Sequence, residues 1–597
     1  MSRVRERLYA IPKLRVSQRA DAIRIENVEA LDDHPVNLVE HLEHWAHAQP
    51  DAVFLAERAG SRWSELRYLH IRDWVNRVAA RMMQRGAVQG DFLLIAADNS
   101  VAHAVASFAA MKIGVGVIPV PPSWCTSAAG HAKLRKVVEL TRPRFRYFEQ
   151  SRPVDIVAAA CDLAEVLETV REGDEGEDIS AVVGAAAVVR GTTIAKLLFT
   201  SGSSGPPKGV INTHAMLCAQ QQQMAQAWPF VAQPPLVLCD WLPWCHTSGG
   251  NNSLNMVLRN GGTLYIDNGR PTAEGILTTA ANLAEVRPTW YTNVPLGYSM
   301  LLPLFEKDDD LAAALFSRLD LLVYGGAPLS ASVWQGINRV CRHVTGRDAP
   351  WASGWGLTET TSTVCVTTRP VSSTGVIGTP LPGMEMLLKP AGAYHEAYVR
   401  GPNVCPGYYG DPERNDAALS SEGFFRTGDL VRVVEPADAT SGLAYVGRAS
   451  ECFKLGTGKW VIPGEIKFEI QKEFGPQARD VIVAGPGQDF LTIFVWLDNS
   501  THSDVDAGTQ GLFGTLEAVL RTYNAARPTA SSRIHAAYVL PRSFCPEPGE
   551  LTEKGSLSYV RFLLQRKSLV EAVYELARKV PEGCVLDADV ARIEASV

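Results

Sequence analysis

Short apolar runs alternate with stretches of helical periodicity along much of this chain, and this alternation restricts the fold more than any other feature. Residues 92–97 (FLLIAA) have the length and composition of a buried strand, and residues 101–112 those of a helix packed after it. Further strands are predicted at 194–200, 236–242, 262–266, 289–293 and 319–324. Such alternation is typical of doubly wound α/β sheets. We therefore predict an α/β protein whose N-terminal part contains two doubly wound sheets.

The length of 597 residues exceeds what one hydrophobic core normally spans, so two or more domains are expected. Past about residue 375, short strand-like runs separated by Gly, Pro and Asp predict a small β-rich subdomain. After about residue 447, strands and helices mix again. We place the boundary at 446–450. This gives a large N-terminal domain of residues 1–447 and a smaller, mobile α+β C-terminal domain of residues 448–597.

Composition and charge exclude several classes of function. A net charge of -7 and a pI near 6.1 give no electrostatic reason to expect nucleic acid or an anionic membrane as partner. The 11 cysteines are scattered without a C-x-x-C pair, which argues against a zinc site or a disulfide framework and favours the cytoplasm. The basic N-terminus lacks the apolar core of a secretory signal. The most apolar stretch, residues 101–122, contains charge, glycine and proline, so no membrane insertion is expected.

The segment TSGSSGPPKG, residues 200–209, directly follows a predicted strand. Its glycines allow backbone N–H groups to approach an anion, its hydroxyls add donors, and Lys208 supplies the only charge. This composition indicates a phosphate-binding loop. It is not a Walker loop, because the spacing G-x-x-x-x-G-K-[ST] is absent. The alternative is a flexible Ser/Gly linker, which the strand before it and the helix-compatible run after it make the weaker interpretation.

Five motifs in order resemble those of the adenylate-forming superfamily, which contains acyl-CoA synthetases, adenylation domains and firefly luciferase. They are the loop at 200–209, GGAPL at 325–329, WGLTE at 355–359, TGD at 427–429 and Gly447-Arg448. The resemblance implies an ATP site. Its residues would be Thr200, Ser201, Gly202, Ser203, Ser204, Gly205, Lys208, Gly326, Ala327, Pro328, Trp355, Gly356, Thr358, Asp429 and Arg448.

The resemblance also implies what these residues do. Trp355 would pack on adenine, Thr358 would contact the α-phosphate, and Glu359 would hold Mg²⁺ as the only protein carboxylate. Asp429 and Arg448 would bind the ribose. Because a carboxylate attacking a triphosphate joins two anions, neutralising their charge is the main catalytic task.

A segment around His246, LPWCHTSGG, is similar to the family segment that flanks the acyl pocket and gates the pantetheine tunnel. We expect His246 to act as a gate and pocket wall rather than as a general base. An aromatic pocket could involve Trp241, Trp244, Tyr291 and Tyr298, although an aromatic stripe is more often simple core packing. Residues assigned to the acid are Trp244, His246, Ser248, Gly249, Gly325 and Gly354.

The C-terminal part departs from the family pattern at two places. Ser450 stands where the family hinge is commonly Asp or Lys, and Lys454 matches a lysine that faces the site during thioester formation. The family's terminal lysine, which bridges carboxylate and phosphate, aligns with Ser556, while Lys554 lies two positions earlier. Either the loop is re-registered and Lys554 acts, or adenylation is weak. We favour Lys554.

Within the superfamily the resemblance is strongest to feruloyl-CoA synthetase-like acid–CoA ligases, through WLPW-x-HT-x-GGN at 241–251 and the T-[DE]-KGS terminus. It implies activation of an aromatic or phenylpropanoid acid by ATP and Mg²⁺, followed by transfer to coenzyme A; medium- or long-chain aliphatic acids come next. The nearest alternative is an acyl-AMP ligase that loads a carrier protein. A hydrolase is disfavoured because no G-x-S-x-G elbow exists. A non-catalytic scaffold is the last alternative, and a homodimer is compatible with the sequence.

Overall fold

The computed structural model describes most of the chain. The described residues are 9–149, 156, 160–171, 179–200, 207–233, 235–326, 329–371, 373–474, 478–497, 507–527, 529, 532–541, 543–547, 550–551 and 557–587.

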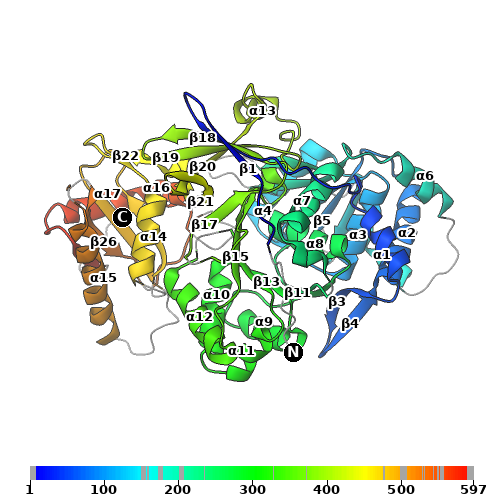
Figure 1. The fold of residues 1–597 in the computed structure, drawn as a ribbon, viewed down its shortest axis with the longest axis horizontal. Coiled ribbons are helices and arrows are strands. Elements are labelled where there is room, and N and C mark those ends of the chain that lie inside the picture. Colours follow the sequence, from blue (N-terminus) through cyan, green and yellow to red (C-terminus); the bar gives the residue numbers. More distant parts are fainter. Residues whose placement is uncertain are drawn as a thin grey trace.

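A six-stranded sheet lies at one end of the molecule in the described part of the chain (Figure 1). Its strands, in spatial order, are β10 (Lys208–Thr213), β9 (Ile194–Thr200), β6 (Gly116–Pro119), β5 (Phe92–Ala96), β7 (Phe145–Phe148) and β8 (Cys161–Asp162). All neighbours are parallel except β10 and β9. Its surrounding helices are α1 (Glu40–Ala48), α2 (Tyr68–Gln84), α3 (Val101–Lys112), α4 (Ala128–Thr141), α5 (Ala164–Arg171) and α6 (Ser180–Val188).

The segment after the phosphate-loop motif differs from its prediction. A strand, β10, follows the motif instead of a helix, and helix α7 (His214–Ala227) begins only after it. The reason is local: β10 supplies backbone hydrogen-bonding partners to β9, which would otherwise be an edge strand. The motif therefore connects two antiparallel neighbours, and Lys208 is the first residue of the second strand.

A larger sheet of fifteen strands runs through the rest of the described N-terminal part. Its parallel portion contains β3 (Val53–Ala59), β12 (Thr263–Ile266), β11 (Val237–Asp240), β13 (Trp290–Asn293), β14 (Leu321–Tyr324) and β15 (Trp351–Trp355), with β4 (Arg62–Arg67) antiparallel at its edge. Helices beside this portion are α8 (Leu254–Asn260), α9 (Gly275–Val286), α10 (Pro295–Phe305), α11 (Asp309–Phe316) and α12 (Ala331–Thr345).

The β-rich portion predicted after residue 375 continues this sheet through antiparallel strands. They are β16 (Cys365–Val366), β17 (Val376–Pro380), β21 (Asp438–Arg448), β20 (Phe425–Glu435), β19 (Tyr394–Arg400) and β18 (Glu385–Ala391), followed by β2 (Ile23–Asn27) and β1 (Leu14–Gln18). A short helix, α13 (Pro412–Ala418), precedes β20. The N-terminal strand β2 thus pairs with β18, more than 350 residues away, and β1 pairs with β2; local sequence patterns could not indicate the long-range pairing.

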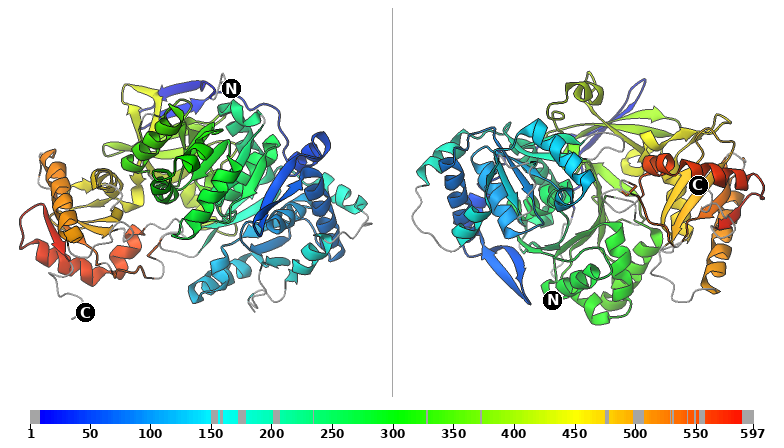
Figure 2. Two further views of the ribbon diagram at one scale, coloured as in Figure 1. Left: turned by 90° about the horizontal axis from the view of Figure 1, so that it is seen from below. Right: turned by 180° about the vertical axis from the view of Figure 1, so that it is seen from behind.

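The C-terminal part has a four-stranded sheet of its own among the described residues: β24 (Ala478–Ala484), β25 (Leu491–Leu497), β26 (Ile534–Val539) and β27 (Cys584–Asp587). Around it lie the small hairpin β22 (Phe453–Lys454) and β23 (Trp460–Val461), and helices α14 (Pro463–Phe474), α15 (Ala507–Ala525), α16 (Tyr559–Gln565) and α17 (Lys567–Ala577). Both views of Figure 2 place this part at the end of the molecule opposite the six-stranded sheet. The predicted α/β class is confirmed.

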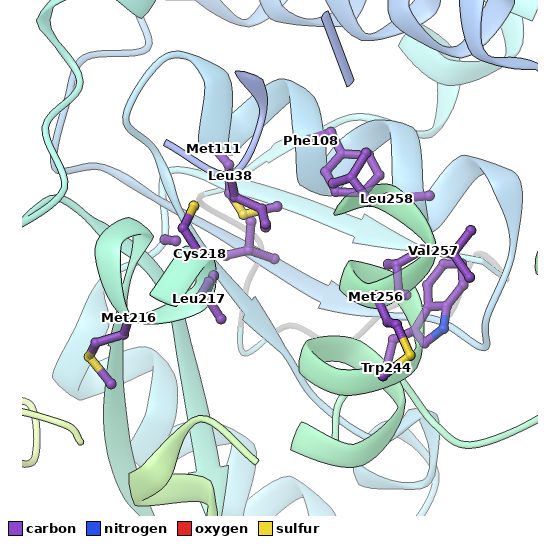
Figure 3. Packing of buried hydrophobic residues seen from close by; sticks show 14 of the residues in the cluster. Leu38, Phe108, Met111, Met216, Leu217, Cys218, Trp244, Met256, Val257 and Leu258 are labelled. Carbon is purple, nitrogen blue, oxygen red and sulfur yellow. The ribbon is translucent and has the colours of Figure 1, made fainter. Parts of the chain in front are cut away.

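The main core fills the space between the two large sheets. Every residue of α3 except Ala102 is buried, and α3 contacts β5 and β6 of one sheet and β3 of the other. Figure 3 shows Phe108 of α3 near Leu258 of α8, with Trp244 beside Met256 and Val257. No helix in the described ranges has both the length and the apolarity to cross a membrane.

Candidate active site

Lys208, Glu359 and Tyr408 form a hydrogen-bonded triangle although they are far apart in sequence. The Lys208 ammonium lies 2.7 Å from Glu359 Oε1 and 3.0 Å from the Tyr408 hydroxyl, which itself donates to Glu359 Oε1 at 2.8 Å. Tyr408 is held beside β10 because it bridges Val210 and because the Tyr409 N–H donates to the Gly209 carbonyl. The strand that follows the phosphate-loop motif therefore gathers a cation, a carboxylate and a phenol.

Burial and charge determine the ionisation of this triangle. Burial alone would raise the pKa of Glu359, but the Lys208 charge and the hydrogen bonds from Lys208 and Tyr408 outweigh it, and the pKa lies below its usual value. The pKa of Tyr408 is raised, chiefly by burial and then by the Glu359 charge. Glu359 is thus an anion at neutral pH, Tyr408 is a neutral donor, and the side chain of Lys208 keeps 24% of its surface exposed. An ammonium so placed can contact an incoming anion.

Glu359 owes its position to a tightly packed turn after β15. The turn consists of Gly356, Leu357 and the 3-10 helix η5 (Thr358–Thr360), so Thr358 and Glu359 are adjacent on one short element. A Cβ on Gly356 would lie 2.2 Å from the Ser362 carbonyl oxygen, so the close approach requires glycine. The buried Asn403 side chain donates to the carbonyls of Thr360 and Thr363 and fixes the turn from outside.

A second cluster joins Trp355, Asp429 and Arg448. Asp429 and Arg448 are cross-strand neighbours on β20 and β21, and Arg448 Nη1 lies 3.0 Å from Asp429 Oδ1. The Trp355 indole N–H donates to Asp429 Oδ2 at 3.0 Å. Burial is the largest influence and would lower the pKa of Arg448, but the charges of Asp429, Tyr445, Glu359 and Glu451 together outweigh it, so this pKa is raised. The structure thus brings together the aromatic ring, carboxylate and guanidinium that the sequence assigned to one nucleoside site.

Several predicted nucleotide residues border or leave the described ranges. Thr200 ends β9, and its buried hydroxyl has no hydrogen-bonding partner among the described residues. Gly325 and Gly326 follow β14, where Gly326 has a φ of 82° and a Cβ on Gly325 would meet open space. Outside the described residues lie Ser201, Gly202, Ser203, Ser204, Gly205, Ala327, Pro328 and Lys554.

The segment assigned to the acid runs from the end of β11 into an unusual helix. Residues 241–247 lead into the π-helix η4 (Ser248–Ser253), which continues as α8. The His246 N–H donates to the Pro243 carbonyl, and its carbonyl accepts from the Gly250 N–H. Asn99 clamps the segment by donating to the Leu242 carbonyl and accepting from the Trp244 N–H, each at 2.9 Å. His246 and Ser248 remain half-buried, and π-helices are often found at functional sites.

The aromatic residues considered for an acid pocket are packed in the core. Tyr291 and Tyr298 are each 1% exposed, and their ring centres lie 5.8 Å apart in an edge-on contact. The Tyr298 hydroxyl donates to the Val323 carbonyl at 2.7 Å. Trp244 is buried too and packs edge-on against His103. For the two tyrosines this geometry matches the packing alternative. Gly354, on β15, lies in the same strand as Trp355.

Ser450 and Lys454 lie at the start of the C-terminal part. Ser450 is in the 3-10 helix η6 (Ala449–Glu451), directly after Arg448. Lys454 is exposed on β22, with its ammonium 6.0 Å from the ring centre of Trp460. Across the junction, the Tyr394 hydroxyl of β19 donates to Glu465 Oε1 of α14 at 2.7 Å. The Lys454 ammonium thus lies beside a ring of its own hairpin, and its carbonyl accepts from the Gly487 N–H at 3.1 Å.

Glu359 is the residue that could help to hold a divalent cation. Among the described residues no group of three or more His, Cys, Asp and Glu side chains is arranged as a metal site. A lone carboxylate still fits Mg²⁺, because this ion keeps water and phosphate oxygens as most of its ligands. The ionised state of Glu359 fits a Mg²⁺–phosphate group, as does the Thr200 hydroxyl, which has no hydrogen-bonding partner in the described part of the chain.

Sequence reasoning missed Tyr408, Asn403 and Lys196. Tyr408 and Asn403 lie in the run NVCPGYYG, whose Gly and Pro content had indicated only a β-rich subdomain. Their roles depend on contacts with residues 40 to 200 positions away, so no local pattern marks them. Lys196 did have a signal: it is a lone charge inside the apolar strand IAKLLFT.

Known proteins resemble this chain in three ways: through a family model, through the sequence of a relative, and through the fold of solved structures. The family model "AMP-binding enzyme" matches residues 42–409. The long-chain-fatty-acid–CoA ligase FadD15 of Mycobacterium bovis is 24% identical over 593 residues, covering 88% of this chain and 95% of that protein. Two solved structures share the fold, each with a TM-score of 0.70. One is the anthranilate CoA ligase AuaEII with anthranoyl-AMP (18% identity; 90% and 99% covered), and the other is McyG A-PCP with phenylalanyl-adenylate (16%; 93% and 86%).

Proposed function

This chain belongs to the AMP-binding enzyme family, and from that premise we propose that it activates a carboxylic acid as its acyl-adenylate and transfers the acyl group to coenzyme A. In the first step a carboxylate oxygen attacks the α-phosphorus of ATP, and the bond to the bridging oxygen breaks as pyrophosphate leaves with the electron pair. In the second step the thiolate attacks the acyl carbonyl carbon and AMP leaves, while the thiol proton passes to solvent.

The observation that carries this proposal is the Lys208–Glu359–Tyr408 triangle beside the phosphate-loop motif. Lys208, the first residue of β10, is paired with Thr200, the last residue of β9. The ammonium and the Thr200 hydroxyl therefore stand at the two ends of the loop. An anionic triphosphate can replace Glu359 as the partner of Lys208, which leaves Glu359 available to a cation. Thr358, adjacent to Glu359, is assigned to the α-phosphate.

The Trp355–Asp429–Arg448 cluster supports adenosine binding. A carboxylate that accepts from both an indole N–H and a guanidinium is fixed in orientation, and it can exchange part of this bonding for two ribose hydroxyls. We assign Asp429 and Arg448 to the ribose and Trp355 to the adenine. Mg²⁺, when bound near Glu359, would neutralise charge on the phosphates.

The acid is proposed to be aromatic or phenylpropanoid, in line with the feruloyl-CoA synthetase-like segment at 241–251. His246 and Ser248, both half-buried, are assigned to the acid pocket together with Trp244, Gly249, Gly325 and Gly354. The relatives point to two chemistries: one is named for long-chain fatty acids and another for anthranilate. Long-chain acids are therefore the main competing substrates.

Two domains with separate tasks complete the proposal. Residues 1–447 would bind ATP and the acid, and residues 448–597 would turn about Ser450 to present Lys554 for adenylation and Lys454 for thioester formation. Support comes from the separate four-stranded sheet after residue 448 and from its own apolar clusters. The similarity to McyG A-PCP supports a second acceptor, a carrier protein, as the alternative to coenzyme A.

A substrate panel tests the proposed function. The purified full chain is incubated with ATP, Mg²⁺ and aromatic, phenylpropanoid, medium-chain or long-chain acids, with and without coenzyme A. Pyrophosphate release and mass spectrometry of the products are the readouts. We expect acid-dependent pyrophosphate release and an acyl-CoA product, both reduced roughly 100-fold by Lys208→Ala.

The exposed Lys307→Ala should leave both unchanged and serves as the control. A chain that releases no pyrophosphate with any acid contradicts the proposal. Release without an acyl-CoA product would instead favour the carrier protein as acceptor.

A further inference from the structure

Lys196 is a buried lysine without an acidic partner. In the described part of the chain two lysines are buried, Lys112 and Lys196. Lys112 is ion-paired with Glu43, whereas Lys196 forms no ion pair with any described residue. An unpaired ammonium in a protein interior is costly and usually implies a specific task.

The Lys196 ammonium binds the π-helix η4. It donates to the Gly250 carbonyl at 2.9 Å and to Asn251 Oδ1 at 3.2 Å. Both acceptor atoms belong to η4, which begins at Ser248 and directly follows the segment that contains Trp244 and His246. The Gly250 N–H in turn donates to the His246 carbonyl. Lys196 is therefore linked to the backbone of His246 through the hydrogen bonds of one residue, Gly250.

A buried amide network extends this contact to the neighbouring strand. Asn251 Nδ2 donates to Asn212 Oδ1 on β10 at 2.7 Å and to Thr247 Oγ1 at 3.1 Å, and Gln221 of α7 donates to the Asn251 carbonyl. Lys196 on β9 and Asn212 on β10 therefore hold η4 against the two strands that border the phosphate-loop motif.

We propose that Lys196 is a positioning residue that fixes η4, and with it the acid-binding segment 244–249, relative to the phosphate loop. This inference rests on the proposed function and deepens it. Lys196 lies four residues before Thr200, so one strand carries both the loop and the ammonium. The distance between a bound carboxylate and a bound phosphate is then set by β9, and small displacements of reacting groups strongly reduce rate.

The charge of Lys196 is sensitive to pH near neutrality. Burial lowers the pKa of Lys196 to about 7. The titratable groups that face it are His103 of α3 and His214 of α7, and burial lowers the pKa of each to about 4. Both imidazoles are therefore neutral where Lys196 titrates. As pH rises through about 7 the ammonium loses its proton, and its charge-assisted hydrogen bonds to η4 weaken.

The test compares Lys196→Met with Lys196→Gln and Lys112→Met in the acid-dependent pyrophosphate assay on the full chain. Methionine keeps the length of lysine without its donors, and glutamine restores two donors. We expect Lys196→Met to raise the KM for the acid about ten-fold, with the KM for ATP changed by less than about two-fold. Lys196→Gln should recover part of the loss, and Lys112→Met, a buried lysine outside the site, should leave the KM for the acid unchanged.

A pH series separates positioning from simple destabilisation. Between about pH 6 and about pH 8.5 the wild-type KM for the acid should rise, whereas that of Lys196→Met should not follow the same transition. If Lys196→Met does not fold, Asn212→Ala removes the next hydrogen bond of the network and should give the same rise in acid KM.

The outcomes distinguish the two proposals. A wild type that releases no pyrophosphate with any acid overturns the proposed function and this inference together. A working wild type whose acid KM is unaffected by both Lys196→Met and Asn212→Ala, or is raised equally by Lys112→Met, overturns the inference alone.

Discussion

At the scale of single residues, Tyr408 is the side chain on which the other two members of its triangle depend. Its hydroxyl donates to Glu359 while accepting from Lys208, so it stays bonded to the carboxylate if Lys208 turns toward an anion. Glu359 is nearly buried and would otherwise lose one of its donors at that moment. An ionised carboxylate in such a place needs every donor it has.

Replacing Tyr408 by Phe should therefore weaken adenylation without unfolding the chain. We expect acid-dependent pyrophosphate release to fall about ten-fold, the size typical of one hydrogen bond to a charged group. The concentration of Mg²⁺ required for half-maximal rate should rise as well, since Glu359 is no longer held. The measurement is a Mg²⁺ titration of pyrophosphate release.

Tyr409→Phe is the matched control, because the neighbouring ring packs edge-on against Phe92 and its hydroxyl takes no part in the triangle. Equal losses in the two variants would contradict a specific role for Tyr408.

The sequence alone pointed to site residues that stand in short contiguous motifs, but not to those whose contacts are far away in the chain. Glu359, Asp429 and Arg448 were proposed as site residues because each stands in a short motif, and the structure places Glu359 in one side-chain cluster and Asp429 and Arg448 in the other. Tyr408 was not found, because its function arises from contacts with two segments 49 and 200 residues away. Tertiary contacts of this kind leave no periodic signal in the chain.

At the scale of elements, η4 shows how tightly one turn can be specified. A Cβ on Gly249 would lie 2.1 Å from the Leu242 carbonyl oxygen and 2.6 Å from that of Pro243, and both are backbone atoms. A Cβ on Gly250 would lie 2.3 Å from the Trp244 carbonyl oxygen. The helix therefore packs directly on the backbone of the segment that carries His246, and the glycines are required for this contact.

Gly249→Ala should force η4 away from that segment. We expect a loss of about 2 kcal/mol in the free energy of unfolding, as for other overpacked sites, together with a raised KM for the acid. Denaturant unfolding and the pyrophosphate assay measure the two effects. Gly184→Ala, at an open position in α6, is the control and should be neutral or slightly stabilising. An unchanged KM in Gly249→Ala would show that η4 does not shape the acid site.

Elements were predictable where they bury one continuous apolar run. The strand at 194–200 and the helix at 101–112 have the predicted bounds in the structure, since most of their residues are buried. The strand β10 was not predicted, although Val210, Ile211 and Thr213 favour an extended backbone; its pairing with β9 is a tertiary contact. The π-helix η4 was not predicted either, because Lys196 contacts it from another element and Asn99 holds the segment before it.

At the scale of the whole molecule, two lysines of the C-terminal part belong to different steps of the proposed reaction. Lys454 lies on the β22–β23 hairpin beside Trp460, while the Tyr394–Glu465 hydrogen bond fastens α14 to β19. The proposal assigns Lys454 and Lys554 to the Lys208 triangle in different steps, and rotation about the junction near Ser450 would present them in turn.

Lys554→Ala and Lys454→Ala should therefore fail in opposite half-reactions. Lys554→Ala should reduce acid-dependent pyrophosphate release roughly 100-fold, because a cation between carboxylate and phosphate is lost, yet it should convert a pre-made acyl-adenylate to thioester normally. Lys454→Ala should form adenylate at the wild-type rate and be slow only in thioester formation. Each variant is measured in both half-reactions, with Lys459→Ala, a half-buried lysine next to β23 of the same hairpin, as the control. Normal adenylation by Lys554→Ala would show that the lysine two positions before Ser556 does not replace the family's terminal lysine.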